Sequence, residues 1–172
     1  VSRELRKALG ELYATSFRNT GVFLAKLLSS REFYSAPARR AIVSSPADFA
    51  IGTLRTLGAT AGADRLPAEM SRMGMDILRP PSVKGWQKGE SWLNSSTLLA
   101  RYRFASMLTS DTENSPRTPW DRIEKGKAEG LFNLFFPGGL DERIRRLVEK
   151  EAGQDLKLMV TAIVELPEHQ YI

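Results

Sequence analysis

The stretch between Pro80 and Arg101 constrains the fold more than any other part of the sequence. It reads Pro-Pro-Ser-Val-Lys-Gly-Trp over residues 80–86, and Gly89 and Trp92 follow shortly after. A proline disfavours helical backbone in the residue before it, so a helix arriving from the N-terminal side is expected to stop near Arg79. Glycine then permits sharp bends. The sequence therefore predicts a long irregular loop between two helices, here called the tryptophan loop (residues 80–93).

The two tryptophans of this loop allow two arrangements. On a glycine-rich turn flanked by Lys84 and Lys88, Trp86 and Trp92 can form an exposed stacking platform for a ligand. Alternatively, both indoles fold back and seal neighbouring helices, in which case each N–H needs a partner. Exposed tryptophan without a partner is disfavoured, which favours the buried arrangement.

The rest of the chain carries helical patterns. Ser45-Pro46-Ala47-Asp48 combines a capping serine, a proline at the first helical position and an acidic residue in the first turn. Apolar residues elsewhere repeat at intervals of three and four. These patterns predict helices over 2–13, 19–30, 45–57, 67–79, 94–108, 118–126, 140–152 and 155–166. The apolar run 131–136 is expected to form a helical turn or an extended plug, and residues 168–172 are expected to trail. The predicted fold is an irregular all-α domain of seven or eight helices.

The length of the chain suits a single helical domain spanning 1–172, with a possible sub-boundary in the polar loop 109–118. The first residue is Val1 rather than an initiator methionine, so we expect a fragment of a longer parent. No apolar run approaches the roughly 20 residues that a membrane-spanning helix needs.

Charge and composition narrow the function classes. The sequence has no cysteine and a single histidine, His169, so we expect no metal site and no cofactor. The net charge of +5 is uneven, because residues 1–110 carry +8 and residues 111–172 carry −3. A basic portion attracts polyanions. However, no basic run exceeds two residues and no nucleic-acid motif is present, so nucleic-acid binding is disfavoured.

Several segments together resemble a large bacterial family, the domain of unknown function 1800 family. They are Leu27 to Tyr34, Ser45 to Gly58, Pro80 to Trp86, Trp92 to Arg101 and Leu166 to Gln170. In the last segment Leu166 and His169 depart from the family pattern. The resemblance implies that this chain is the C-terminal portion of a longer protein. It also implies an exported, periplasmic or envelope setting, because such genes neighbour those of a sulfatase-like exported family.

The resemblance supplies no catalytic residues, so the candidate residues rest on local chemistry. The candidate ligand-binding residues are Lys84, Trp86, Trp92 and Arg101. A second interpretation concerns the arginines that lie on helices beside apolar residues. Arg55 and Arg101 are then expected to form structural ion pairs with a carboxylate, and the candidates are Asp48, Asp76 and Glu90.

Two functions follow as hypotheses. The first is a non-catalytic helical module that binds a glycan or a sulfatase-like exported protein through the tryptophan loop. The second is the C-terminal part of an envelope enzyme, a hydrolase acting on polysaccharides or sulfate esters, whose catalytic groups lie mostly upstream. A triad within this chain is disfavoured because His169 is the single histidine and no Gly-x-Ser-x-Gly elbow exists.

Overall fold

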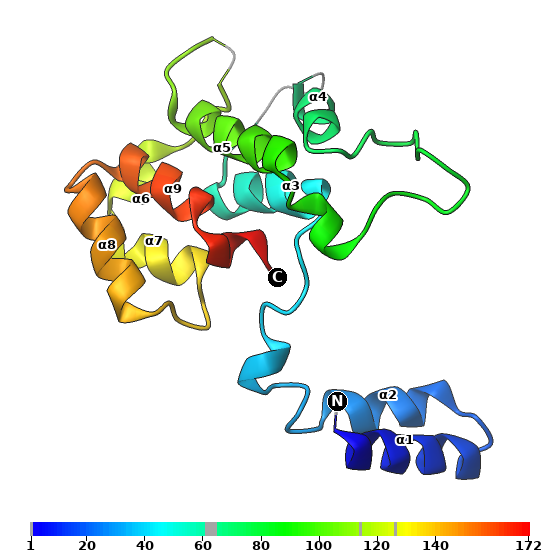
Figure 1. Ribbon diagram of the computed structural model, residues 1–172. Helices are drawn as coiled ribbons and strands as arrows, with labels where there is room; N and C mark the ends of the chain where they lie inside the picture. The colour runs from blue at the N-terminus through cyan, green and yellow to red at the C-terminus, as the bar shows by residue number, and fades with distance from the viewer. Residues whose placement is uncertain (1, 61–64, 114, 126) are drawn as a thin grey trace. The chain divides into compact units, whose positions relative to one another are not determined.

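The computed structural model describes residues 2–60, 65–113, 115–125 and 127–172, and every regular element among these residues is a helix (Figure 1). The all-α prediction is confirmed. The α-helices within the described residues are α1 (Arg3–Thr15), α2 (Thr20–Leu28), α3 (Pro46–Leu57), α4 (Arg65–Arg72), α5 (Ser95–Thr109), α6 (Trp120–Lys125), α7 (Lys127–Phe135), α8 (Glu142–Ala152) and α9 (Leu156–Glu165). Three short 3₁₀ helices are η1 (Ala36–Ala38), η2 (Gly89–Trp92) and η3 (Pro167–Gln170). The apolar run 131–136 lies mostly in α7, which explains why there is one helix more than expected.

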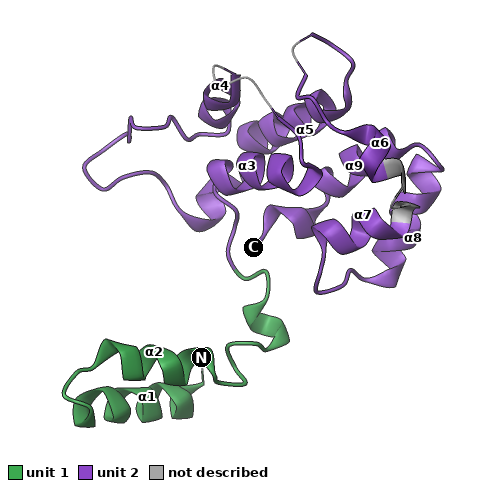
Figure 2. Cartoon of the chain, turned by 180° about the vertical axis from the view of Figure 1, so that it is seen from behind, with its two compact units in different colours: residues 1–41 green, residues 42–172 purple. Residues whose placement is uncertain are grey.

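The chain forms two compact units, residues 1–41 and residues 42–172 (Figure 2). Unit 1 is a helical hairpin in which α1 packs against α2. Side chains of Ser2 and Asn19 cap the two helices, and the Tyr13 and Phe23 rings meet edge to face at 5.7 Å. The polar loop 109–118, proposed above as a sub-boundary, lies inside unit 2.

Helix α9 is the centre of unit 2. It packs against α5, α7 and α8, and its residues Met159, Val160 and Ile163 are fully buried. Helix α3 joins this core through Phe49, whose ring lies 5.9 Å from that of Phe104 on α5. The core therefore combines helices from the first and last thirds of unit 2.

Helix α3 begins as its sequence predicts. The Ser45 hydroxyl accepts a hydrogen bond from the Asp48 N–H at 3.1 Å, and the Asp48 carboxylate accepts one from the Ser45 N–H at 3.3 Å. This reciprocal pair is a capping box. Gly58 ends the helix with φ +63°, a conformation that glycine adopts without strain.

Replacing Ser45 by alanine is expected to lower the free energy of unfolding by about 1 kcal/mol, because the first turn of α3 loses its side-chain acceptor. Urea titration of the variant beside the wild type measures this. Ser95→Ala is the matched control, because Ser95 is already inside the first turn of α5 while Asn94 supplies that cap. Equal stabilities of the two variants would contradict the assigned role of Ser45.

Helix α4 is shorter than predicted. It ends at Arg72, not near Arg79, so the expectation of a helix over 67–79 is wrong at its C-terminal end. The physical reason is Gly74, whose φ of +94° ends the helical path, and a Cβ placed there would lie 3.7 Å from the Trp92 ring. Helix α4 therefore stops before the two prolines are reached.

The end of the chain is also ordered differently from the expectation. Residues 168–172 were expected to trail, but Tyr171 pairs with Val43 in an isolated antiparallel bridge. Ser44 N–H donates to the Gln170 carbonyl at 2.9 Å, and Ile172 N–H donates to the Ile42 carbonyl at 2.8 Å. These bonds attach the last residues to the segment that precedes α3.

Candidate functional site

Trp92 and Trp86 do not form a joint exposed surface, because each makes contacts within unit 2. Trp92 is 5% exposed and contacts Gly74, and its carbonyl accepts a hydrogen bond from the Thr97 hydroxyl at 2.8 Å. Trp86 is half-buried, and its indole N–H donates to the Asp76 carbonyl at 3.0 Å. Of the two arrangements left open by the sequence, Trp92 adopts the buried one, and Trp86 fastens the loop to residues just after α4.

Arg101, another candidate ligand contact, is completely buried on α5. Its guanidinium donates to the Ser44 carbonyl at 2.7 Å and to the Gln170 side-chain oxygen at 3.1 Å, and it lies 4.7 Å from the centroid of the Phe49 ring. Its Nε is buried with no hydrogen-bond partner among the described residues. Burial lowers the pKa of Arg101 to about 10, so the group stays charged at neutral pH. Through these hydrogen bonds Arg101 connects α5 to Ser44 near the start of unit 2 and to Gln170 near its end.

The remaining predicted residues lie apart. Lys84 and Glu90 are exposed in the tryptophan loop, and Asp48 is engaged in the cap of α3. Asp76 lies 3.7 Å from Arg79 in an exposed pair. None of the ion pairs among the described residues joins Arg55 or Arg101 to these carboxylates. Arg101 instead hydrogen-bonds neutral oxygens, a difference from the expected ion pair.

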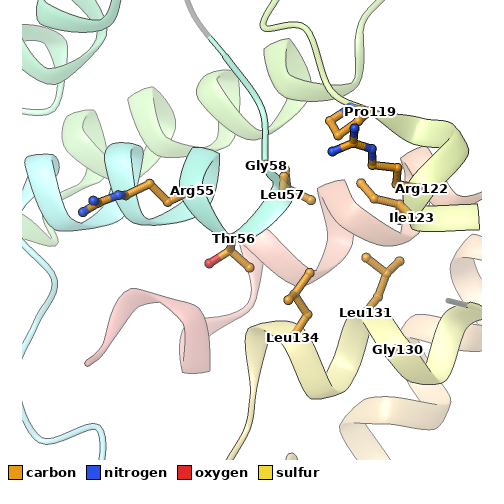
Figure 3. A pocket seen from close by; sticks show the side chains of 10 residues that line it. All are labelled: Arg55, Thr56, Leu57, Gly58, Pro119, Arg122, Ile123, Gly130, Leu131 and Leu134. Carbon is orange, nitrogen blue, oxygen red and sulfur yellow. The ribbon is translucent and has the colours of Figure 1, made fainter.

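Arg55 leads to a different site. It lines a pocket of about 350 Å³ at the C-terminal end of α3, where that helix meets α6 and α7 (Figure 3). A backbone bridge shapes this region, because Thr60 and Arg117 exchange two hydrogen bonds of 3.0 and 2.8 Å. The bridge holds Gly58 close to Pro119, and a Cβ placed at Gly58 would lie 3.7 Å from the proline ring.

The inner wall of the pocket is apolar. Leu57 and Leu131 belong to the core of unit 2, whereas Leu134 is 48% exposed and lies toward solvent. In Figure 3 the side chains of Leu57, Ile123, Leu131 and Leu134 surround the same space. The pocket is thus an extension of the hydrophobic core that opens to the surface.

Cations lie at the mouth of this pocket. The Arg122 guanidinium is placed beside Pro119 above the apolar side chains, while that of Arg55 points away from them (Figure 3). An adjacent pocket of about 330 Å³ shares Gly58, Pro119 and Arg122 and is also lined by Arg117 and Asp121. No ion pair within the described part of the chain involves Arg117 or Arg122. Among the described residues that line the adjacent pocket, Arg117 and Arg122 outnumber the one carboxylate, that of Asp121, so their net charge is positive.

The sequence reasoning did not find Arg122, Arg117 or Leu134. Arg117 precedes α6, Arg122 lies on α6 and Leu134 lies on α7. No spacing rule connects these residues with the end of α3. The pairing of Thr60 with Arg117 had no detectable sequence signal, since each residue stands alone in a polar loop.

Three further observations concern the residues that the structure describes. They contain no group of three His, Cys, Asp or Glu side chains placed to hold a metal ion. His169 lies among aromatic rings, with Phe135 and Phe49 at 5.3 and 5.4 Å, and its Nε2 is 3.0 Å from the Thr53 hydroxyl. Among the described residues, no helix has the length and apolar character that a bilayer crossing requires.

The described residues define an all-α protein with a long tryptophan loop between α4 and α5. Comparison with family models is more specific. The chain belongs to the family described as "Protein of unknown function (DUF1800)", whose model matches residues 1–171. No curated protein matches the sequence, and no solved structure matches it either. The resemblance found in the sequence is therefore confirmed, and it carries no established activity.

Proposed function

We propose that the chain is a non-catalytic binding module whose ligand site is the pocket between α3, α6 and α7. The ligand class is an apolar group bearing an anion, such as a carboxylate or a sulfate ester. The observation that carries this proposal is the coincidence of an apolar wall with arginines that form no ion pair within the described residues.

The dimensions of the pocket suit such a ligand. Small-molecule sites typically start at about 300 Å³ and combine an apolar lining with a few polar groups that orient the ligand. Here the wall formed by Leu57, Leu131 and Leu134 would take the apolar part. Arg122, with Arg117 beside it, would take the anion through charge-assisted hydrogen bonds. Asp121 at the same mouth disfavours a second negative charge on the ligand.

The site differs from the one first expected. Trp92 has almost no exposed surface, and the indole N–H of Trp86 is already used, so the tryptophan pair offers little for glycan stacking. An exported or envelope setting and a sulfatase-like partner remain proposals that rest on the resemblance alone. The alternative of an envelope enzyme with upstream catalytic groups has no supporting observation in this chain.

The test is titration calorimetry with octanoate, octyl sulfate and the uncharged analogue octanol. The wild type should bind both anions more tightly than octanol. Arg122→Gln should weaken octanoate binding by about tenfold, the effect expected when one charge-assisted hydrogen bond is lost. Binding of octanol should change little in this variant, because the apolar wall is intact.

Two controls make the test decisive. Arg103→Gln removes an exposed arginine from α5, which does not line the pocket, and should leave octanoate binding unchanged. Leu134→Asp places a carboxylate on the apolar wall and should abolish binding of both anions. If octanoate binds Arg122→Gln and wild type equally, or binds neither, the pocket is not the proposed site.

A further inference from the structure

The three most exposed large apolar side chains among the described residues share one feature. They are Val83, Leu78 and Phe17, exposed by 106%, 88% and 98% respectively. Each is followed directly by a basic residue, which is Lys84, Arg79 and Arg18 in turn. Leu78 and Phe17 have φ values of +64° and +53°, in a region that non-glycine residues rarely adopt. An apolar side chain in full contact with water, next to a cation, thus recurs in separate parts of the chain.

Two of these pairs lie in one projecting segment, residues 78–88. In Figures 1 and 2 the chain between α4 and α5 extends away from the helices of unit 2. The segment is nevertheless fastened at its base. The Trp86 indole donates to the Asp76 carbonyl, and the Gly85 N–H donates to the Ser82 carbonyl at 3.0 Å. The fold therefore presents Leu78 and Val83 outward on a defined turn.

The charge of the projecting segment is one-sided. Residues 78–88 contain Arg79, Lys84 and Lys88 and no acidic residue. The nearest carboxylates flank the segment: Asp76 pairs with Arg79 at 3.7 Å, and Glu90 is exposed in η2. Lys84 and Lys88 are exposed and form no ion pair with either carboxylate within the described residues, so both are available to an external anion.

We propose that residues 78–88 dock this protein on the surface of an anionic lipid bilayer. Leu78 and Val83 would enter the boundary between headgroups and acyl chains, and Lys84 and Lys88 would contact lipid phosphates. Trp86, half-buried beside them, has the amphipathic ring that is enriched at this depth. A soluble polyanion would account for the lysines but would leave both apolar side chains in water.

Unit 1 supports the same chemistry independently. Its 41 residues carry eight basic and three acidic side chains, so its net charge is +5 and that of unit 2 is zero. Leu9 is its one buried large apolar residue among those described, whereas Phe17 stands exposed beside Arg18. A cationic hairpin with exposed aromatic groups also matches an anionic bilayer surface.

The test is co-sedimentation of the full chain with phosphatidylcholine vesicles, with or without about 30% phosphatidylglycerol, at low and physiological salt. The wild type should sediment with the anionic vesicles and not with the neutral ones. The double variant Leu78→Asp/Val83→Asp should bind anionic vesicles about tenfold more weakly or worse, since it loses both apolar contacts and adds two negative charges.

The matched control is Leu147→Asp/Leu158→Asp. It makes the same charge change at two exposed leucines on α8 and α9 and should keep most of the binding. Thermal unfolding of both double variants shows whether they are folded. Tryptophan emission should shift to shorter wavelength when wild type meets anionic vesicles, because Trp86 lies within the docking segment.

Other outcomes overturn the proposal. These are no sedimentation of wild type with anionic vesicles, or equal loss of binding in the two folded double variants. A third is binding of soluble dextran sulfate as tight as that of vesicles, with no effect of Leu78→Asp/Val83→Asp on either, because this would assign the surface to a polyanion. The pocket proposal uses different residues and soluble ligands, so either proposal can fail without the other.

Discussion

Replacing Arg101 by alanine is expected to lower the free energy of unfolding by about 3–5 kcal/mol, in the range found when one partner of a buried charged pair or a large core side chain is removed. The change empties a fully buried volume between α5 and Phe49. It also leaves the Ser44 carbonyl and the Gln170 side chain without their shared donor. Equilibrium urea unfolding followed by circular dichroism measures the loss.

Arg101→Met separates the two causes. Methionine fills most of the volume and removes a buried charge that has no carboxylate partner among the described residues. Because such charges are costly to bury, Arg101→Met should be clearly less destabilising than Arg101→Ala. If both variants lose the same stability, the hydrogen bonds to Ser44 and Gln170 dominate. If Arg101→Ala loses less than about 1 kcal/mol, as an ordinary surface change does, the buried position of Arg101 is wrong.

Trp92→Ala is the second change with a large expected effect, about 3–5 kcal/mol of unfolding free energy, the usual range for emptying a core tryptophan site. A Cβ placed at Gly74 would lie 3.7 Å from the Trp92 ring, so the ring packs close to the turn that follows α4. The variant should therefore lose stability and also loosen the attachment of the tryptophan loop. Hydrogen exchange at the end of α4 should accelerate.

Trp86→Ala is the companion variant, because Trp86 is half-buried and makes one hydrogen bond. Its expected loss is smaller, about 1–2 kcal/mol. Urea unfolding of both variants measures how much free energy of unfolding each one loses. An equal or larger loss for Trp86→Ala would contradict the assignment of Trp92 as the main structural tryptophan of the loop.

The helices were predictable wherever their ends are encoded locally. Ser45 with Asp48, Asn94 with Thr97, and Asp155 each cap a helix through bonds that span two or three residues. The end of α4 was placed too late because the apolar spacing continues through Met73 and Ile77, although Gly74, with φ +94°, is a local helix-ending signal. The order of the last residues depends on Val43, which is far away in sequence.

The candidate pocket could not be predicted for a related reason. Arg55 was noticed as a cation on an apolar helix, but its neighbours at the site come from α6 and α7. Their convergence depends on the bridge between Thr60 and Arg117, which no local pattern encodes. The expected carboxylate partner of Arg101 is replaced by Ser44 and Gln170, whose distance in sequence from Arg101 leaves no local pattern to predict them.

The position of Arg101 has a consequence for how unit 2 is completed during synthesis. Its partners stand 57 residues earlier and 69 residues later in the chain. A nascent chain that has released α3 and α5 from the ribosome already contains Arg101 and Ser44 but not Gln170. The full set of hydrogen bonds of this side chain therefore cannot form until η3 has been synthesised, so the interior of unit 2 is completed only after α9 and η3 have left the ribosome.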